Sequence, residues 1–587
     1  MKLLSVVIAS LASIPVAYGN TIYVSPNGSG DQSGSSPENA CAGLVAAYEK
    51  VNKDDVVTLQ LTADTYAITS SDFLTLSKAA DVTIAGDAEH PEKVVLDGAN
   101  ADVGFFSTSR KTTLRGLTLQ RANVTTASRQ AITITSSSAE VVIDSCVFSA
   151  LTNVSCGAAL YSNVGATLTI TNCDFTACSS SASGSADMGG AVYIGKGAGS
   201  AVFADCRFRD CAANQGGAIS GFETLFKCTF VRCSAKYGGA VAKSAFAPSL
   251  ISNCTFLANS STDSSGNYGG GAVWMGSDVS IVGCQFLTNT SAKIGGAVHM
   301  SSGEATLRDC VFSGNVAAVG CGAASGVAVV EDCRFVGNAT TSSDGGALAM
   351  TYQKGDGRIM RSTFVGNAAE AGKAAAIYAN NKANLLIDTC EFRQNVGKSG
   401  NPGGGAIFVN TGSVTIRNSL FAGNEFHDKG GSCVGLPNNT TFPLLVENTT
   451  FVSNTVEATV SGHVPVSKGF ALSATNCLFY ANFDSYGKMM RNFASGQVLD
   501  NVAYTASDDD KLIAQPGCFK LTKYPFVGGD DFRLRSRHAE LVDKGLSLSW
   551  MTADAKDLAG NARVYGAAPD LGCYEWVPKV GLLLLLR

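Results

Sequence analysis

The sequence predicts an all-β protein, a single-stranded right-handed parallel β-helix with a short N-terminal capping helix. Three observations favour this fold: a leader typical of export, a composition rich in glycine and poor in charge, and a unit that recurs thirteen times. Among 587 residues there are 64 Gly but only 13 Pro, and 16% are charged. Such a composition is typical of many tight turns around a continuous core of small residues. We therefore expect one elongated repeat array rather than several globular domains.

Residues 1–19 have the properties of a secretory signal peptide. Lys2 supplies the positive charge, residues 3–16 the apolar stretch, and Ala17-Tyr18-Gly19 a small-x-small cleavage site. The apolar stretch is too short for a good membrane span. The mature chain is expected to start at Asn20, to lack a membrane span, and to be secreted or held at the cell surface in association with an outer membrane.

Residues 20–139 are expected to form an N-terminal cap and the first, irregular coils. Ser36 and Pro37 have the properties of an N-cap and an N1 residue, and they precede an apolar stretch that reaches about Val51. A helix here would close the open first coil, whose exposed sheet ends would otherwise aggregate. The first coils are expected at residues 56–67, 82–86 and 94–98.

Residues 140–485 contain the regular repeat. Each unit carries Cys or a small residue, then x-Phe, then usually Asn three positions later, and often Gly-Gly-Ala followed by an apolar residue. Neighbouring Phe residues are 22 to 33 positions apart, at Phe148, Phe175, Phe208, Phe230, Phe256, Phe286, Phe312, Phe335, Phe364, Phe392, Phe421, Phe451 and Phe479. The repeat is therefore the main evidence for a solenoid.

Each unit is predicted to be one coil of short strands, because its segments are β-branched or aromatic and are separated by Gly, Ser, Asn and Asp. In residues 307–312, Cys310 and Phe312 alternate on one face, whereas Leu307 is an odd number of residues from both, which requires a corner. Stacked coils would place Phe on Phe and Asn on Asn about 4.8 Å apart. The predicted structural ladder comprises Phe256, Asn259, Phe286, Asn289, Phe312, Asn315, Phe335 and Asn338.

The nineteen cysteines mostly occupy one inward position of the repeat. A buried row of thiols accounts for this position by small apolar packing. Cys178, Cys211 and Cys233 differ, because they replace the ladder Asn in three successive coils. Adjacent coils would bring their Cα atoms within disulfide range, so a disulfide among these three is possible.

The paired motifs Phe-x-x-Asn and Gly-Gly-Ala-[Ile/Leu/Val], as in residues 286–289 with 295–298, resemble the repeats of polymorphic outer membrane proteins. The resemblance implies a surface-displayed β-helical passenger with a pectin lyase-like solenoid, often an adhesin. This chain departs from that family because no C-terminal run of roughly ten alternating strands could form a membrane barrel.

Four C-terminal blocks are similar to the choice-of-anchor Q domain, which implies a module that closes secreted β-helix proteins. They are residues 531–534, 541–545, 557–563 and 569–576. We expect residues 486–576 to form this C-terminal cap and residues 577–587 a tail.

Candidate chemistry is sparse. The five histidines are scattered and never paired at zinc-ligand spacing. Acidic runs at residues 508–510 and 530–531 could hold Ca²⁺ or act as general acid and base, although solvated loops explain them equally. Four further carboxylates precede glycine turns in different copies, namely Asp187, Asp263, Asp344 and Asp428. Three lysines before the glycine turns could line one edge of the solenoid and meet an anionic glycan, namely Lys236, Lys293 and Lys429, although solvated turns also explain them. No catalytic residue and no cofactor is predicted, with Ca²⁺ as the one ion to consider.

Three functions follow as alternatives. The first is a non-catalytic, monomeric surface protein that binds a glycan or a host or environmental surface protein. The second is a lyase or hydrolase of an acidic polysaccharide, which would need carboxylates of neighbouring coils to converge on one face. The third is a structural component of a surface layer or matrix. A net charge of −5 argues against a nucleic-acid partner.

Overall fold

The computed structural model describes residues 19–125, 130–181, 188–195, 199–244, 247–266, 268–342, 344–350, 355–380, 384–398, 405–427, 433–435, 442–456, 467–468, 471–484, 486–487, 489, 497–505, 515–536, 538 and 540–578. The predicted signal peptide, apart from Gly19, and the tail beyond residue 578 lie outside these residues. The chain divides into two compact units, Met1–Gly303 and Glu304–Arg587, which we call unit 1 and unit 2.

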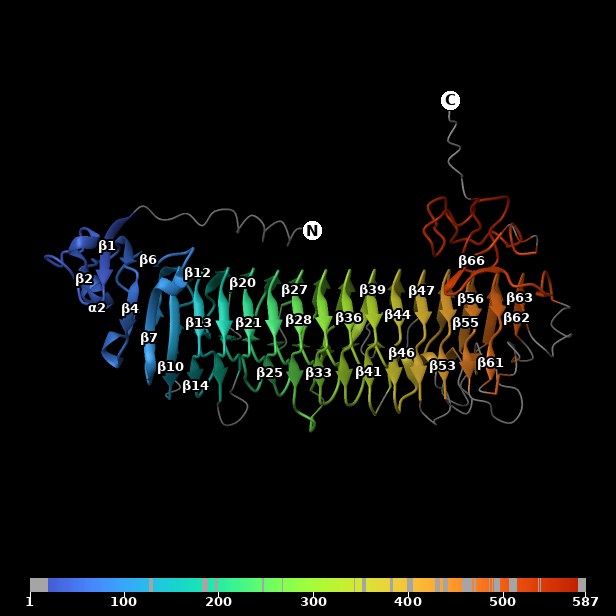
Figure 1. The fold of residues 1–587 in the computed structure, drawn as a ribbon, viewed down its shortest axis with the longest axis horizontal. Helices are drawn as coiled ribbons and strands as arrows, with labels where there is room; N and C mark the ends of the chain where they lie inside the picture. Colours follow the sequence, from blue (N-terminus) through green and yellow to red (C-terminus); the bar gives the residue numbers. More distant parts are fainter. Residues whose placement is uncertain are drawn as a thin grey trace, which may run out of the picture. The chain divides into compact units, whose positions relative to one another are not determined.

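Each unit is a right-handed parallel β-helix built from coils of short strands (Figure 1). A regular coil passes through four strands in a fixed order, one in each of four parallel sheets that we call A, B, D and C. In unit 2, for example, β35 (Ala305–Arg308), β36 (Val311–Ser313), β37 (Val316–Ala317) and β38 (Ala324–Ser325) form one coil. Every strand of a coil therefore pairs with its counterpart in the next coil.

Sheets A and C of unit 1 begin in the N-terminal cap. The strands of sheet A are β1 (Asn20–Ser25), β2 (Cys41–Ala42), β3 (Val56–Leu61), β6 (Asp81–Ala85), β9 (Lys111–Arg115), β12 (Glu140–Asp144), β16 (Thr167–Thr171), β20 (Ala201–Ala204), β23 (Thr224–Phe226), β27 (Ser249–Ser252) and β31 (Val279–Val282). Those of sheet C are β5 (Leu74–Leu76), β8 (Phe106–Thr108), β11 (Ile132–Ile134), β15 (Leu160–Ser162), β19 (Val192–Ile194), β22 (Ile219–Ser220), β26 (Val241–Lys243), β30 (Val273–Met275) and β34 (Val298–Met300).

Sheets B and D of unit 1 follow the same plan. The strands of sheet B are β4 (Asp64–Ala67), β7 (Val94–Ala101), β10 (Thr118–Val124), β13 (Val147–Ser149), β17 (Asp174–Thr176), β21 (Arg207–Arg209), β24 (Thr229–Val231), β28 (Thr255–Leu257) and β32 (Gln285–Leu287). Those of sheet D are β14 (Thr152–Asn153), β18 (Ser179–Ser180), β25 (Ser234–Ala235), β29 (Ser260–Ser261) and β33 (Thr290–Ser291), and the end of β10 pairs with β14.

Unit 2 continues the coil pattern. Sheet A contains β35, β39 (Val327–Glu331), β43 (Gly357–Met360), β47 (Leu385–Asp388), β51 (Val414–Arg417), β55 (Pro443–Glu447), β59 (Ala471–Thr475) and β62 (Val498–Asp500). Sheet B contains β36, β40 (Arg334–Val336), β44 (Thr363–Val365), β48 (Glu391–Arg393), β52 (Leu420–Ala422), β56 (Thr450–Val452), β60 (Leu478–Tyr480), β63 (Ala503–Tyr504) and β64 (Phe519–Lys520).

The two other sheets of unit 2 have shorter or more variable strands. Sheet D contains β37, β41 (Ala339–Thr340), β45 (Ala368–Ala369), β49 (Val396–Gly397), β53 (Glu425–Phe426), β57 (Thr455–Val456) and β61 (Phe483–Asp484). Sheet C contains β38, β42 (Leu348–Met350), β46 (Ala374–Ala379), β50 (Gly405–Val409), β54 (Val434–Gly435) and β58 (Ser467–Lys468).

Single residues in the left-handed region make the corners. Between β35 and β36, Asp309 has φ 52°, which turns the chain and lets Leu307 and Phe312 both point inward. The corner predicted from the odd spacing of these two residues is therefore confirmed. Asn and Asp recur at this corner, as at Asn172, Asn253 and Asp332, because they tolerate this conformation better than most residues.

The two glycines of each pair that precedes a sheet C strand are required for different structural reasons. In unit 1, Gly238 has φ 61°, and a Cβ on Gly239 would lie 2.0 Å from the carbonyl oxygen of Gly271 in the next coil. The first glycine thus permits the turn, and the second permits the close approach of two backbones.

The N-terminal helix differs from the prediction. Ser36 and Pro37 begin a short 3₁₀-helix, η1 (Pro37–Asn39), rather than the α-helix, and Ser36 makes no side-chain cap hydrogen bond. The chain then becomes extended at Ala40, because Cys41 pairs with Val24 of β1. The capping helix α2 (Gly43–Glu49) starts only afterwards and buries Leu44, Ala47 and Tyr48. Two further 3₁₀-helices are η2 (Ser70–Asp72) and η3 (Pro91–Lys93).

The end of unit 2 is a compact module that packs on the coils. A hairpin of β65 (Phe526–Gly528) and β66 (Asp531–Leu534) precedes a segment rich in turns. Leu541 and Leu571 of the module share one apolar cluster with Leu420, Val452 and Leu478 of sheet B. The buried side chain of Arg563 pairs with Glu575 at 2.6 Å and donates to the side chain of Asn418.

Candidate functional site

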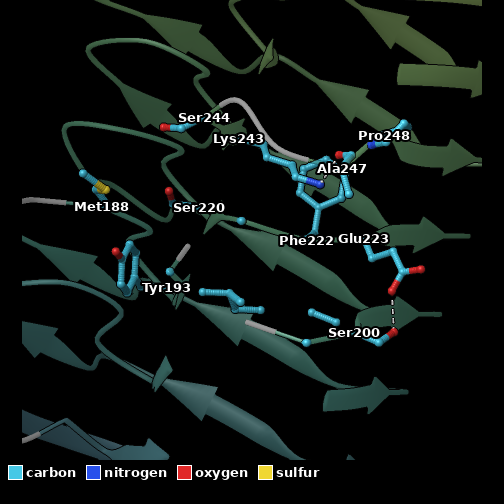
Figure 2. Close-up of a pocket in the computed structure, with 15 residues that line it drawn as sticks. Met188, Tyr193, Ser200, Ser220, Phe222, Glu223, Lys243, Ser244, Ala247 and Pro248 are labelled. Carbon is cyan, nitrogen blue, oxygen red and sulfur yellow. Dashed lines mark hydrogen bonds between the residues drawn. The ribbon is translucent and has the colours of Figure 1, made fainter. Parts of the chain in front are cut away.

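A cleft of about 360 Å³ opens on unit 1 where three successive coils turn from sheet C to sheet A (Figure 2). Its residues come from the ends of β19, β22 and β26 and from the segments that lead into β20, β23 and β27. Because successive coils repeat the same turn, side chains at equivalent positions meet in one row along the cleft.

Aromatic side chains line two parts of this cleft. Tyr193 is the outward residue of β19, between the inward residues Val192 and Ile194. Its ring stacks on that of Tyr161 at a centroid distance of 5.3 Å. Phe222 lies on the other side in Figure 2, and only 3% of it is exposed. The partly exposed ring of Tyr193 therefore offers a flat apolar surface to a ligand, whereas the ring of Phe222 is buried.

One acid and one base face the same cleft. The carboxylate of Glu223 accepts a hydrogen bond from the hydroxyl of Ser200, one coil earlier (Figure 2). The ammonium of Lys243 donates to the carbonyl oxygen of Ala247 at 2.9 Å and to the hydroxyl of Ser249 at 2.7 Å. Burial lowers the pKa of Lys243 below its usual value, and the negative charge of Glu223 opposes this effect. The cleft therefore combines rings with a small set of fixed polar groups, as ligand sites commonly do.

The predicted ladder residues lie in the interior of the coils. In unit 1, the rings of Phe256 and Phe286 stack at 4.8 Å, and the Asn259 side chain donates to that of Asn289 at 3.0 Å. In unit 2, Phe312 stacks on Phe335 at 4.9 Å, and Asn315 donates to Asn338 at 2.9 Å. All eight side chains are 0% exposed. This arrangement makes them structural supports of the coils.

Cys178, Cys211 and Cys233 lie in the same column as the ladder asparagines. The backbone N–H of Cys233 donates to the side-chain oxygen of Asn259, so the thiol row continues directly into the Asn row. All three residues carry thiols in the structure and are fully buried. Burial raises the pKa of Cys233, as expected for a thiolate in an apolar interior. A disulfide among them stays a prediction.

Three of the charged residues near the glycine turns, Lys236, Asp263 and Lys293, lie close together on unit 1. Hydrogen bonds from Ser265 lower the pKa of Asp263, and the charges of the two lysines lower it further. Asp263 accepts hydrogen bonds from the backbone and hydroxyl of Ser265, and Asp344 accepts from the backbone N–H of Lys373. Lys293 donates to the carbonyl oxygen of Ser264. Asp187, Asp428, Lys429 and residues 508–510 lie outside the described residues. In the described ranges, no three His, Cys, Asp or Glu side chains are grouped so as to hold a metal ion.

The sequence analysis missed the cleft residues. The available signal was the residue that follows Gly-Gly-Ala-Val, which is Tyr193 in one coil and Trp274 in another. That position points outward between two inward residues, so an aromatic residue there marks a surface site.

The comparisons with known proteins bear on the fold. The family model described as right handed beta helix region matches residues 104–286 and 191–368. The crystal structure of pectate lyase Pel9A aligns with 96% of this chain and 98% of that chain, at 14% identity and a TM-score of 0.21. No curated protein matches the sequence. Among the described residues, no helix has the length and apolar character needed to cross a membrane. The chain thus has the repeats and the fold of a right-handed parallel β-helix protein.

Proposed function

We propose that this chain is an exported protein, secreted or displayed at the cell surface, that binds a glycan without cleaving it. The observation that carries the proposal is the cleft between sheets C and A of unit 1, where Tyr193 and Phe222 flank the polar groups of Glu223, Lys243 and Ser200. A sugar ring presents C–H groups on its faces and hydroxyls at its edge, so it complements such a surface.

The repeat geometry supports a chain-like ligand. Successive coils lie about 4.8 Å apart, so equivalent outward positions of sheet C form a regular row. In unit 1 this row carries Tyr161, Tyr193, Ser220, Ala242 and Trp274 in paired register. Ser220, Ala242 and Trp274 are buried, so a polymer would contact this row at the neighbouring, partly exposed rings of Tyr161 and Tyr193. We propose a glycan as the partner and a monomer as the binding species.

A glycan array tests the proposal with the mature chain from Asn20 onward. Retention of at least one polysaccharide is expected, and Tyr193→Leu should weaken it about tenfold through loss of the ring surface. The matched control is Tyr378→Leu, since Tyr378 is the outward residue of a sheet C strand in unit 2 and packs beside Phe408. Equal retention by the wild type and Tyr193→Leu, or equal loss in both variants, would contradict binding at this cleft.

A second candidate function is cleavage of a polysaccharide. It is favoured by Lys243, because burial lowers the pKa of this lysine, so that its amine becomes neutral and available as a general base at a lower pH than usual. Mass spectrometry of each retained polysaccharide after incubation separates the two functions. Intact ligand supports binding alone. Shortened or unsaturated products that disappear in Lys243→Met would make the chain a hydrolase or lyase.

A further inference from the structure

A second group of side chains on unit 1 is independent of the cleft residues. Gln215, Tyr237 and Tyr268 precede the glycine pairs of three successive coils, and Trp274 is the outward residue of β30 in the third. Gln215 and Tyr237 pair through an isolated parallel bridge, as do Met188 and Gln215. Since Met188 also lines the cleft, this group continues along the same surface.

The three aromatic residues form a shelf. The rings of Tyr237 and Tyr268 stack at 4.6 Å, and Trp274 meets the ring of Tyr237 edge-on at 5.0 Å and 64°. Tyr268 is 42% exposed, whereas Trp274 is only 7% exposed. A solvated ring therefore covers a buried indole, and the free area of Tyr268 can receive the apolar face of a ligand.

Two buried polar atoms beside this shelf lack a hydrogen-bond partner within the described part of the chain. They are the side-chain oxygen of Gln215, an acceptor, and the indole N–H of Trp274, a donor. The amide N–H of Gln215 already donates to the hydroxyl of Tyr237. That hydroxyl accepts this bond and still has its own proton to donate. Buried polar groups are almost always paired in folded proteins, so an unpaired donor and acceptor here point to an absent ligand.

We infer that Gln215, Tyr237, Tyr268 and Trp274 form a subsite for a neutral sugar residue, distinct from the cleft that holds Glu223 and Lys243. Both orphan atoms are buried beside Tyr268, so binding requires the exposed Tyr268 ring to move aside. A sugar hydroxyl donates and accepts at once, so one or two hydroxyl groups would then satisfy both atoms. The set itself contains no charged side chain, and the charged group that acts on Tyr237 is the carboxylate of Asp263, which disfavours a uronate. The inference rests on the proposed function, which it deepens by assigning the chemical class of one sugar unit.

The indole N–H of Trp274 gives a direct test. The chain contains three Trp residues, and the other two, Trp550 and Trp576, belong to unit 2 and serve as internal controls. We would label the tryptophans with ¹⁵N, assign the signal of Trp274 with Trp274→Phe, and titrate the methyl glycosides of glucose, galactose and mannose, with glucuronate as the anionic comparison. A saturable shift of the Trp274 signal by at least one neutral glycoside, larger than that caused by glucuronate, is expected. A Trp274 signal that moves no more than those of Trp550 and Trp576 would overturn the subsite.

Binding of the array glycan gives the second readout. Trp274→Phe keeps an aromatic ring but removes the indole N–H donor. Gln215→Leu removes the side-chain oxygen acceptor and keeps a side chain of similar size. Each is expected to weaken retention at least about threefold, the loss of one hydrogen bond. If Tyr193→Leu weakens retention but neither subsite variant does, the subsite is wrong and the proposed function stands. If Trp274 responds to a neutral glycoside but no polysaccharide is retained, the subsite stands and the proposed function fails.

Discussion

At the scale of single residues, the buried asparagines show how a polar group can stabilise an interior. In unit 2, the side-chain oxygen of Asn367 accepts from both the backbone and the side chain of Asn338, each at 3.0 Å. Its amide group donates to the carbonyl oxygen of Phe335 and to Asn395. Every hydrogen-bonding atom of this side chain therefore has a partner. These hydrogen bonds compensate for the free energy that it costs to remove the amide from water.

Replacing Asn367 with Ala should lower the free energy of unfolding by about 3 kcal/mol, because it leaves donors of Asn338 and the carbonyl of Phe335 without partners. Chemical denaturation followed by circular dichroism measures the change. The matched control is Asn380→Ala, since exposed Asn380 also accepts a hydrogen bond from an Asn of the next coil, Asn410 at 2.9 Å. That change should stay within about 0.5 kcal/mol. Similar losses in the two variants would show that burial of the ladder does not matter.

At the scale of elements, the C-terminal module is held to the coils by a buried polar network. Arg563 is 1% exposed and donates to Asn418 of a coil corner and to the carbonyl oxygens of Gly572 and Asp570. Glu575 accepts the backbone N–H of Asp570 in addition to its pairing with Arg563. Burying an ion pair costs hydration free energy. The stability of the contact between Arg563 and Glu575 therefore depends on whether Glu575 is protonated.

Stability of the module should fall as pH rises from about 5 to 8. Burial raises the pKa of Glu575 to about 7 from its usual value of 4.5, with the charge of Arg563 opposing the shift. The folded state then binds the proton more tightly than the unfolded state. The resulting stabilisation is complete below pH 4.5 and is lost as pH rises through about 7. The difference in urea midpoint between pH 5 and pH 8 measures this loss.

Glu575→Gln stays neutral at every pH and should flatten this difference. Comparing the variant with the wild type removes every contribution to the pH dependence that the two proteins share. A variant whose urea midpoint falls with pH as steeply as that of the wild type would rule out Glu575 as the responsible group.

At the scale of the whole molecule, the sequence predicts the inside of the coils much better than the outside. Inward positions repeat because each residue must stack on its like in the next coil, and this constraint made Phe256, Asn259 and the glycine pairs visible from spacing alone. Outward positions carry no such constraint, so the position that holds Tyr193 and Trp274 holds Ser220 and Ala242 in the coils between them. Lys243 stands where the next coil has the inward residue Met275, which no spacing rule predicts. The N-terminal cap was also misjudged, because the pairing of Cys41 with Val24 depends on a contact distant in sequence. A candidate site on the outer surface therefore required the three-dimensional structure.

The same inward constraint applies to most of the nineteen cysteines, and all nineteen are buried thiols in the structure. Burial keeps these thiols away from an alkylating reagent in the folded protein. For Cys477 burial also raises the pKa to about 12, which disfavours the reactive thiolate. We expect negligible labelling by iodoacetamide at pH 8 under native conditions and labelling of every thiol after unfolding, measured by intact mass. Two fewer labels after unfolding, recovered by prior reduction and mapped to Cys178, Cys211 or Cys233, would establish the predicted disulfide. Rapid labelling of the folded chain would instead show that the thiol rows are open to solvent, which the close stacking of the coils forbids.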